Sequence, residues 1–438
     1  MSYIPNTDTD RSEMLATIGV PSLDALFDQI PEPQQFQGLL NIPPRLDQIS
    51  LMRHLSSLAR KNVHADDFPC FLGAGIYDHY TPPTVSAITG RSEFYTSYTP
   101  YQPEVSQGML QSIFEFQTLL CQLTGMDVAN ASMYDGATAL AEAAIMASDL
   151  TGRSRIAMLG SVHPNYRAVT ETYLRHMNIT LDIVESSDEL GDETAALLVQ
   201  HPNFYGNLED MEKLSEAAHA KGALLVACVD PISLGILTAP CDYDADIVVG
   251  EGQSLGCPMG YGGPLLGLFA CKNEFMRRLP GRIVGQTTDA DGKRAFVMTL
   301  RTREQDIRRE RATSNICTNE ALYALAASVY LATMGKQGMR QVAELCLQKS
   351  HYAAAEIAKL TGFALAFPKK PFFKEFVVKT PTNPVEINER LLARGIIGGL
   401  PLTKQHSQFG HAMLFCVTEQ RTRAEIDALV AALSEEKR

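Results

Sequence analysis

The sequence predicts an α/β protein with a large, mostly parallel-sheet domain and a smaller C-terminal α+β domain. At 438 residues and 45% hydrophobic, the chain can bury a large core in two or three domains. Short apolar runs alternate with helical patterns through the middle of the chain, as in parallel sheets covered by helices. After about residue 340 the pattern changes. We therefore expect a helical arm at 1–70, a large domain at 71–335 and a small domain at 336–438.

The elements of the large domain follow from continuous apolar runs, which are typical of strands buried on both faces. The expected strands are 155–159, 195–199, 223–229 and 264–270. An alanine-rich helix at 137–150, a helix at 208–220 between two strands, and a long helix at 320–334 complete this domain.

The two ends of the chain are predicted from shorter signals. In the arm, residues 22–27 have the pattern of a capped helix start, and leucines and other apolar residues recur at helical spacing from 46 to 58. In the small domain we expect strands at 372–378 and 413–417 and helices at 384–393 and 423–433.

Composition excludes several functions. The net charge is −12, and no basic cluster is present, so nucleic-acid and anionic-membrane binding are disfavoured. Nine scattered cysteines without a CxxC pair favour reduced thiols over disulfides or zinc, and no histidine has metal-ligand spacing. No apolar run is long enough for a membrane span, and the N-terminus lacks signal-peptide features. We expect a cytoplasmic protein.

A lysine is missing where the expected architecture needs one. Asp230 closes the strand 223–229, and the turn 250–264, with six glycines, follows a second strand. An enzyme that holds pyridoxal phosphate (PLP) would pair the first element's aspartate with a Schiff-base lysine in the second. No lysine occurs between Lys221 and Lys272, so such a chain needs a partner for its chemistry. The alternative is that Asp230 only caps the following turn.

Three polar motifs allow both structural and functional interpretations. Asp135–Thr138, before the alanine-rich helix, is suited to phosphate, but ordinary capping is the favoured interpretation. The segment 94–104 displays Tyr95, Tyr98 and Tyr101 beside two prolines, either to orient a small polar substrate or, as the favoured interpretation, as an aromatic loop packed at an interface. A basic helix at 301–311 leads into the Ser/Thr-rich segment 313–320, which either binds phosphate or caps the helix that follows.

Together these segments resemble the glycine cleavage system P-protein, glycine dehydrogenase (decarboxylating), and most closely its separate N-terminal half, the alpha subunit. The resemblance rests on long stretches in most of the chain: 96–108, 123–132, 135–142, 250–264 and 301–318. It implies the PLP-dependent transferase fold of type I. In that family the lysine precedes the glycine-rich turn, and its equivalent here is Gln253 by one count and Ser254 by another.

The resemblance also implies a function and its partners. Glycine would be decarboxylated and its aminomethyl group passed to the lipoyl arm of the H-protein, with PLP anchored on a beta subunit in an α2β2 enzyme. Substrate-orienting and phosphate-donating residues would reach that site from this chain. The implied substrate residues are Tyr95, Tyr98, Tyr101, Gln102 and Glu104. The implied phosphate donors are Ser314, Asn315 and Thr318.

Two other functions compete with this interpretation. One is a self-sufficient PLP decarboxylase that uses Lys272, the only lysine near the expected position. The other is a non-enzymatic scaffold or regulator that has kept the fold.

Overall fold

The computed structural model describes residues 6–36, 38–402 and 407–435. The chain divides into two compact units, Met1–Val63 and His64–Arg438. In the described chain, no helix has the combination of length and apolar character that crossing a membrane requires. The finer division of the second unit at residue 335 stays a prediction.

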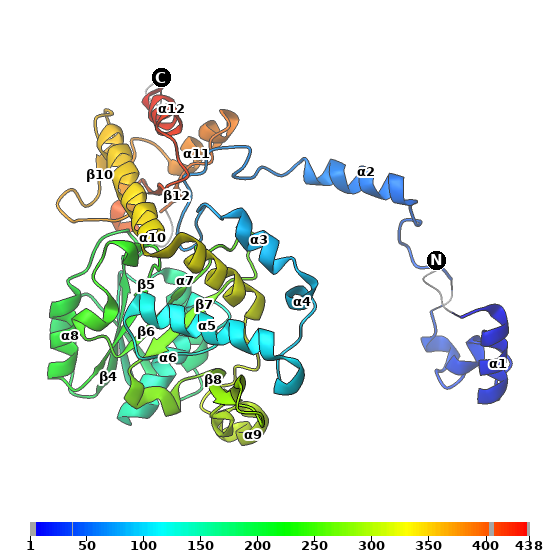
Figure 1. Cartoon of the computed structure of the whole chain (residues 1–438). Coiled ribbons are helices and arrows are strands. Elements are labelled where there is room, and N and C mark those ends of the chain that lie inside the picture. The colour runs from blue at the N-terminus through cyan, green and yellow to red at the C-terminus, as the bar shows by residue number, and fades with distance from the viewer. Residues whose placement is uncertain (1–5, 37, 403–406, 436–438) are drawn as a thin grey trace. The chain divides into compact units, whose positions relative to one another are not determined.

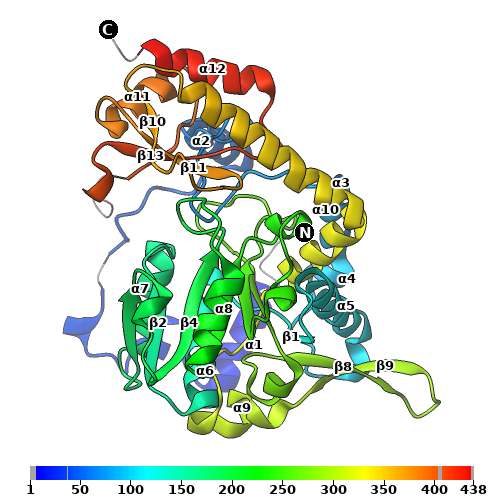
Figure 2. The same ribbon diagram turned by 90° about the vertical axis from the view of Figure 1, so that its left-hand side faces the viewer.

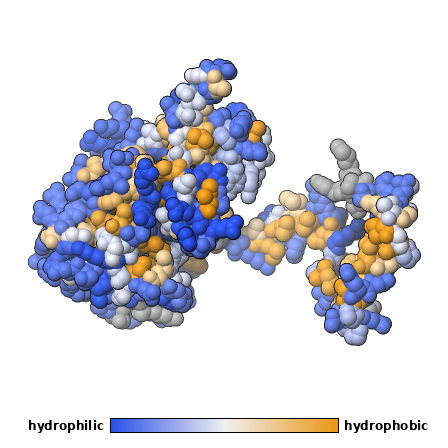
Figure 3. All heavy atoms as spheres, turned by 90° about the horizontal axis from the view of Figure 1, so that it is seen from below, coloured by the Kyte–Doolittle hydropathy of each residue, from blue (hydrophilic) through white to orange (hydrophobic). Residues whose placement is uncertain are grey.

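Between residues 6 and 63, with residue 37 left out, the N-terminal unit contains two α-helices, α1 (Asp8–Ile18) and α2 (Gln48–Ala59). The helical spacing between 46 and 58 is confirmed by α2. The helix expected at 22–27 is wrong, because only a 3₁₀ turn, η1 (Asp24–Phe27), forms there. Prolines at positions 21 and 31 bracket this segment and restrict it to a short turn. Apolar side chains lie on the surface of this unit (Figure 3).

A seven-stranded sheet forms the centre of the second unit (Figure 1). Its order is β1-β7-β6-β5-β4-β2-β3, and only β7 and β1 run antiparallel to their neighbours. The strands are β1 (Val128–Ala129), β2 (Arg155–Leu159), β3 (Thr180–Val184), β4 (Thr194–His201), β5 (Leu224–Val229), β6 (Ile247–Glu251) and β7 (Gly267–Cys271). Strands β4, β5, β6 and β7 are apolar and nearly completely buried, which confirms the mostly parallel sheet.

Helices pack on this sheet and on one another. Helix α6 contacts β4, β5, β6 and β7, while α8 contacts β5. The helices of this part are α3 (Pro83–Thr89), α4 (Ser92–Tyr95), α5 (Gln107–Thr124), α6 (Gly136–Thr151), α7 (Pro164–Leu174) and α8 (Met211–Ala220). The hairpin of β8 (Ile283–Thr288) and β9 (Arg294–Thr299) contacts α5.

A four-stranded antiparallel sheet of order β10-β11-β13-β12 lies in the C-terminal part. It consists of β10 (Ala364–Leu365), β11 (Glu375–Lys379), β12 (Leu400–Pro401) and β13 (Ala412–Cys416), with helices α11 (Pro384–Ala393) and α12 (Arg423–Ser434). Its apolar side chains form a hydrophobic cluster separate from that of the large sheet. The expected strands and helices of this part are confirmed.

One long helix, α10 (Ala321–Ile357), packs against elements of both sheets (Figure 2). It contacts α5 and α3 near the large sheet and α12 and β11 near the small one. Its backbone leaves the helical region at Gly335, which has φ +59°. Glycine tolerates this left-handed φ without a Cβ clash.

The continuous basic helix expected at 301–311 is wrong. The segment breaks into η8 (Arg301–Arg303), α9 (Gln305–Arg308) and η9 (Arg309–Arg311). The Arg303 side chain is buried and donates a hydrogen bond to the Leu279 carbonyl. This tertiary contact overrides the helical preference of the local sequence.

Candidate active site

Asp230 lies at the carboxyl end of β5, the edge at which α/β sheets bind ligands. Its Oδ1 accepts a hydrogen bond from the Ile232 N–H at 3.0 Å, so Asp230 caps the following turn. Its Oδ2 lies 2.6 Å from Nζ of Lys374. The carboxylate therefore both caps the turn and holds a cation, and the cation comes from this chain.

Lys374 precedes β11 and its side chain is 2% exposed. Besides Asp230, its ammonium contacts Nε2 of His79 at 2.9 Å and lies 3.5 Å from the ring centroid of Tyr77. Burial by itself lowers the pKa of Lys374, but the charge and hydrogen bond of Asp230, together with the neighbouring Cys416 and Cys346, outweigh it and raise the pKa above the ordinary lysine value. Lys374 is thus a stably charged ammonium in the protein interior.

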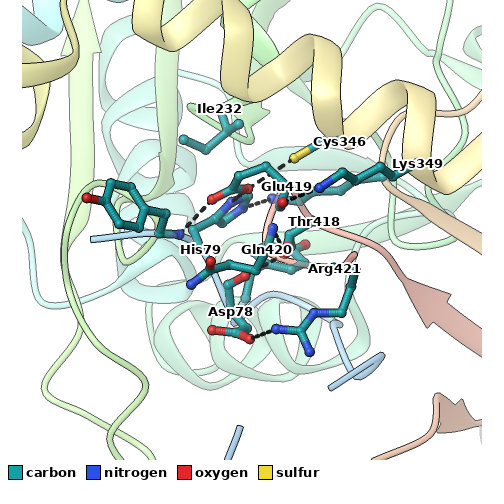
Figure 4. A network of polar contacts seen from close by, with 12 residues as sticks. Asp78, His79, Ile232, Cys346, Lys349, Thr418, Glu419, Gln420 and Arg421 are labelled. Atoms are coloured by element: carbon teal, nitrogen blue, oxygen red, sulfur yellow. Dashed lines mark hydrogen bonds and ion pairs between the residues drawn. The ribbon is translucent and has the colours of Figure 1, made fainter. Parts of the chain in front are cut away.

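A chain of polar contacts continues from Lys374 through His79 to Glu419. Figure 4 shows the part of it that joins His79 to Glu419. Nδ1 of His79 lies 2.6 Å from Glu419 Oε2, and the Tyr80 N–H donates to Glu419 Oε1 at 2.6 Å. Burial alone raises the pKa of Glu419, but the contacts with His79 and Tyr80 outweigh it and lower the pKa to about 2. Because an ammonium has only donors, His79 accepts at Nε2 and carries its proton on Nδ1.

A second carboxylate closes the start of α6. Glu251, the last residue of β6, accepts through Oε2 from the Gly136 N–H at 2.9 Å. Its Oε1 accepts from the N–H groups of Gln253 and Leu266 at 3.0 and 3.1 Å. Asp135 caps the same helix through Thr138. The capping interpretation of Asp135–Thr138 is confirmed.

The two positions equivalent to the missing lysine are both buried. Gln253 accepts from the Tyr77 N–H at 3.0 Å and donates to the carbonyls of Tyr77 and Cys257. Ser254 is 3% exposed. Neither side chain is an amine, so neither can form a Schiff base.

Lys272 does not replace that lysine. Its Nζ lies 2.7 Å from Asp244 Oδ1 and 2.6 Å from Asp246 Oδ1, two residues that precede β6. Since β5 and β6 are parallel, Lys272 lies at the opposite edge of the sheet from Asp230. The structure therefore contradicts a PLP site built on Lys272.

Asp230, Lys374 and Glu251 line a small cavity, which we call the Asp230 pocket. Its volume is about 30 Å³, room for no more than one or two water molecules. Its lining includes the polar side chains of Tyr77, Tyr166, Gln200, Asp230, Glu251, Lys374 and Glu375. Burial raises the pKa values of Glu251 and Glu375 to about 7.

The tyrosine loop, residues 94–104, lies at the surface. Tyr98 is 83% exposed and Tyr95, at the end of α4, is 69% exposed. Gln102 and Glu104 are exposed as well. A wide depression of about 750 Å³ is lined by Tyr98, Tyr101 and Gln102 among others. Exposed rings are compatible with packing at an interface as well as with contact to a substrate, so both interpretations of the loop stay predictions.

The Ser/Thr loop, residues 313–320, meets the tyrosine loop through one buried arginine. Arg282 is 5% exposed and donates to the Tyr101 hydroxyl at 2.8 Å and to Thr318 Oγ1 at 3.1 Å. Ser314 is half-buried and Asn315 is exposed. Asn319 and Glu320 bind segment 131–132. No side chain forms a capping hydrogen bond at the N-terminus of α10, whose N-cap is Glu320. Capping of α10 therefore does not account for the polar residues of the Ser/Thr loop.

Sequence reasoning missed Arg282, Lys374 and Glu142. The buried Glu142 on α6 contacts Ser314, and burial raises its pKa to about 7. The only sequence signal for these residues was a charged side chain next to apolar neighbours. Their partners lie too far along the chain for a local pattern to identify them.

A parallel sheet with an aspartate at the end of β5 and a small C-terminal sheet defines the class of PLP-dependent transferases of fold type I. Solved structures of low sequence identity support that fold. One is a sphingosine-1-phosphate lyase of Burkholderia pseudomallei, 16% identical with a TM-score of 0.65, in which 93% of this chain aligns with 94% of that chain.

More similar proteins identify the family. The family model described as glycine cleavage system P-protein matches residues 1–433. A crystal structure of glycine decarboxylase (P-protein) in inhibitor-bound form is 44% identical, with a TM-score of 0.92, over 99% of this chain and 100% of that chain. The chain belongs to the glycine cleavage system P-protein family.

Curated relatives define the type of subunit. The probable glycine dehydrogenase (decarboxylating) subunit 1 of Desulforamulus reducens is 53% identical over 99% of both chains. That of Desulfitobacterium hafniense is 50% identical over the whole of both chains. The chain is therefore an enzyme subunit of the glycine cleavage system, of the subunit 1, or alpha, type.

Proposed function

We propose that this chain completes, in trans, an active site whose PLP is anchored on a beta subunit. That site decarboxylates glycine and transfers the aminomethyl group to the lipoyl arm of the H-protein. The observation that carries the proposal is the pairing of Asp230 with Lys374. The aspartate that would hold a cofactor ring is already neutralised, and Gln253 and Ser254 provide no amine.

The residues of the Asp230 pocket do not fit PLP. The cavity is too small for the cofactor. Asp230, which would bind the ring nitrogen, already binds Lys374, and the start of α6, which would bind the phosphate, already binds Glu251. No reaction step is therefore assigned to this pocket. The chain's contribution to catalysis must come from residues that another subunit can reach.

Two surface loops meet that requirement. The tyrosine loop would orient glycine at the partner's cofactor site. Its hydroxyl, amide and carboxylate groups come from Tyr95, Tyr98, Tyr101, Gln102 and Glu104. Arg282 supports this assignment, because its hydrogen bond to the Tyr101 hydroxyl anchors an otherwise exposed loop. A loop fixed at its base loses less conformational entropy when it orders a substrate.

The phosphate donors would come from the Ser/Thr loop. The candidate donors are the short polar residues Ser314, Asn315 and Thr318. Of these, Asn315 and Thr318 are exposed. Hydroxyl and amide donors bind phosphate without adding charge. Arg282 joins this loop to the tyrosine loop through Thr318, so both would approach the same partner site.

We further propose an α2β2 assembly that docks a lipoylated H-protein. The subunit 1 type of the chain supports a second subunit. Apolar side chains on α2 support one too, since no residue of that helix is buried in the described structure. Such surfaces are usual at protein–protein interfaces.

Glycine–bicarbonate exchange tests the proposal. The purified chain alone should show no exchange, and mixing it with a PLP-bearing beta subunit and H-protein should restore it. If the beta subunit exchanges equally well without this chain, the chain is a scaffold and the proposal is wrong.

Substitutions in the mixed complex test the loops. Tyr98→Phe and Thr318→Ala should each lower the exchange rate roughly tenfold or more, by removing a positioned hydroxyl. Tyr80→Phe and Thr172→Ala, at exposed positions outside the loops, serve as matched controls. Unchanged exchange in both loop variants would refute the site assignment.

A further inference from the structure

The Asp230 pocket contains groups that match the two charged ends of PLP. The cofactor has a protonated ring nitrogen, which a carboxylate stabilises, and a phosphate, which favours a helix N-terminus. In this chain Asp230 and the start of α6 are the corresponding elements. Asp230 is bound to a positively charged side chain of this chain, as it would be to the ring nitrogen. The start of α6 is bound to a carboxylate of this chain, as it would be to the phosphate.

Lys374 matches the ring nitrogen. Its ammonium has three N–H donors, and three acceptors surround it: Asp230 Oδ2 at 2.6 Å, His79 Nε2 at 2.9 Å and the face of Tyr77, with its centroid at 3.5 Å. No donor is left unsatisfied by these contacts. An entering pyridinium would have to displace a fully bound cation from Asp230.

Glu251 matches the phosphate. Its carboxylate accepts from three backbone N–H groups, those of Gly136, Gln253 and Leu266. The space before the helix is also closed, because a Cβ on Gly136 would lie 2.6 Å from the Tyr166 hydroxyl oxygen and 3.0 Å from the Glu251 nitrogen. A phosphate would meet a carboxylate and a tyrosine instead of free donors.

The segment that carries Lys374 also fixes the C-terminal part to the large sheet. The next residue, Glu375, accepts from the Ala74 N–H at 2.6 Å and from the Tyr77 hydroxyl at 2.8 Å. The backbones of Gly206 and Glu375 also pack closely: a Cβ on Gly206 would lie 1.9 Å from the Glu375 carbonyl oxygen. The pocket therefore has little freedom to widen on that side.

The neighbouring His79, Cys346 and Glu419 do not turn the region into a metal site. Their ligand atoms lie within 4.8 Å of one another. However, the two nitrogens of His79 already contact Glu419 and the ammonium of Lys374. A metal ion there would face a buried cation, so the structure favours a purely internal charge network.

We infer that Lys374 and Glu251 replace PLP inside this chain: Lys374 takes the place of the pyridinium beside Asp230, and Glu251 takes the place of the phosphate at the start of α6. The inference extends the proposed function, in which the cofactor is anchored on the partner subunit. It means that the pocket excludes PLP by occupancy as well as by the missing lysine. The pocket's role is then to join the two sheets.

Deoxypyridoxine phosphate, which lacks the aldehyde and cannot react with surface lysines, is the appropriate probe. Calorimetric titration of the full-length chain should show no binding. The variant Lys374→Ala/Glu251→Ala should bind the probe measurably, at least roughly tenfold above the detection limit that the wild type sets, because truncating both side chains empties the places beside Asp230 and at the helix start. Lys369→Ala/Glu212→Ala, changed at surface residues, should behave as the wild type.

Several outcomes would overturn the inference. They are stoichiometric binding by the wild type, no gain in the double variant although circular dichroism shows it folded, and borohydride trapping of PLP on Lys374. If the double variant does not fold, Glu251→Ala alone, which removes the carboxylate from the helix start, should still bind the probe more tightly than the wild type, and no gain there would also overturn it.

The two proposals fail separately. A wild-type chain that binds the probe yet still needs a beta subunit for exchange would overturn the inference only. A chain that excludes the probe but does not support exchange would overturn the proposed function only.

Discussion

The Asp230 pocket and the surface formed by the tyrosine and Ser/Thr loops contain similar side chains in opposite settings. In the pocket, Lys374 is buried and Asp230 is partly buried, and the two form an ion pair. At the surface, Tyr98 is 83% exposed, and the loops are held from beneath by Arg282. The difference teaches that the residues of a former ligand pocket can pack as core residues, whereas residues that serve a partner must stay exposed. Stability should therefore depend on the pocket and activity on the loops.

The largest expected effect on stability is in the pocket. Lys374→Met leaves the largely covered Asp230 carboxylate without its cation and should lower the free energy of unfolding by about 3–5 kcal/mol, measured by urea denaturation. The double variant Lys374→Met/Asp230→Asn removes both charges and should recover most of that loss. Lys369→Met, at an exposed lysine, is the control. Equal losses in the single and double variants would contradict a direct ion pair.

A pH dependence tests the acid beneath the Ser/Thr loop. Burial raises the pKa of Glu142 from 4.5 to about 7, so its contribution to stability is fully present below pH 4.5 and is lost as pH rises through 7. Between pH 5 and 8 this amounts to at most about 3 kcal/mol. Glu142→Gln should flatten the stability–pH curve over this window. An unchanged slope in denaturation series at several pH values would refute the assignment.

Arg282 should have an intermediate effect on stability and a large one on activity. Arg282→Met removes hydrogen bonds to Tyr101 and Thr318 and should cost about 2 kcal/mol. Exchange by the complex should fall further than stability alone explains, because both loops lose their common support. Arg277→Met, at an exposed arginine, is the control. Normal exchange in a stable Arg282→Met complex would remove the link between the loops and catalysis.

The smallest effect on stability is expected at Tyr98. Its ring is exposed, so Tyr98→Phe should change the free energy of unfolding by less than about 0.5 kcal/mol. Thermal and urea denaturation would measure this beside the exchange assay. A large loss of stability would show that Tyr98 belongs to the core-like region, and the comparison between pocket and surface would break down.

Most of the fold could be predicted from local patterns. The strand 155–159 and the helix 384–393 were predicted with the bounds of β2 and α11, because apolar runs and a proline at the first helical turn are local signals. The two-residue strands β10 and β12 give no such signal. The basic segment 301–311 was wrong because burial of Arg303 decided its conformation.

The candidate site was predictable only in part. Asp230 and the two loops could be proposed because strand ends, tyrosines beside prolines and clustered hydroxyls are visible in the sequence. Lys374 was not, because nothing near it indicates that its ammonium meets Asp230 across the fold. A missing lysine shows that a cofactor is not tethered, but only the structure identifies the groups that take its place.

The pair formed by Lys374 and Asp230 has a consequence for how this subunit responds to vitamin supply. A protein that binds a ligand only when folded gains stability in proportion to the logarithm of the ligand's concentration. A chain with an internal ammonium at that position gains nothing from abundant vitamin B6 and loses nothing when it is scarce. Its folded population should therefore not depend on the supply of the vitamin.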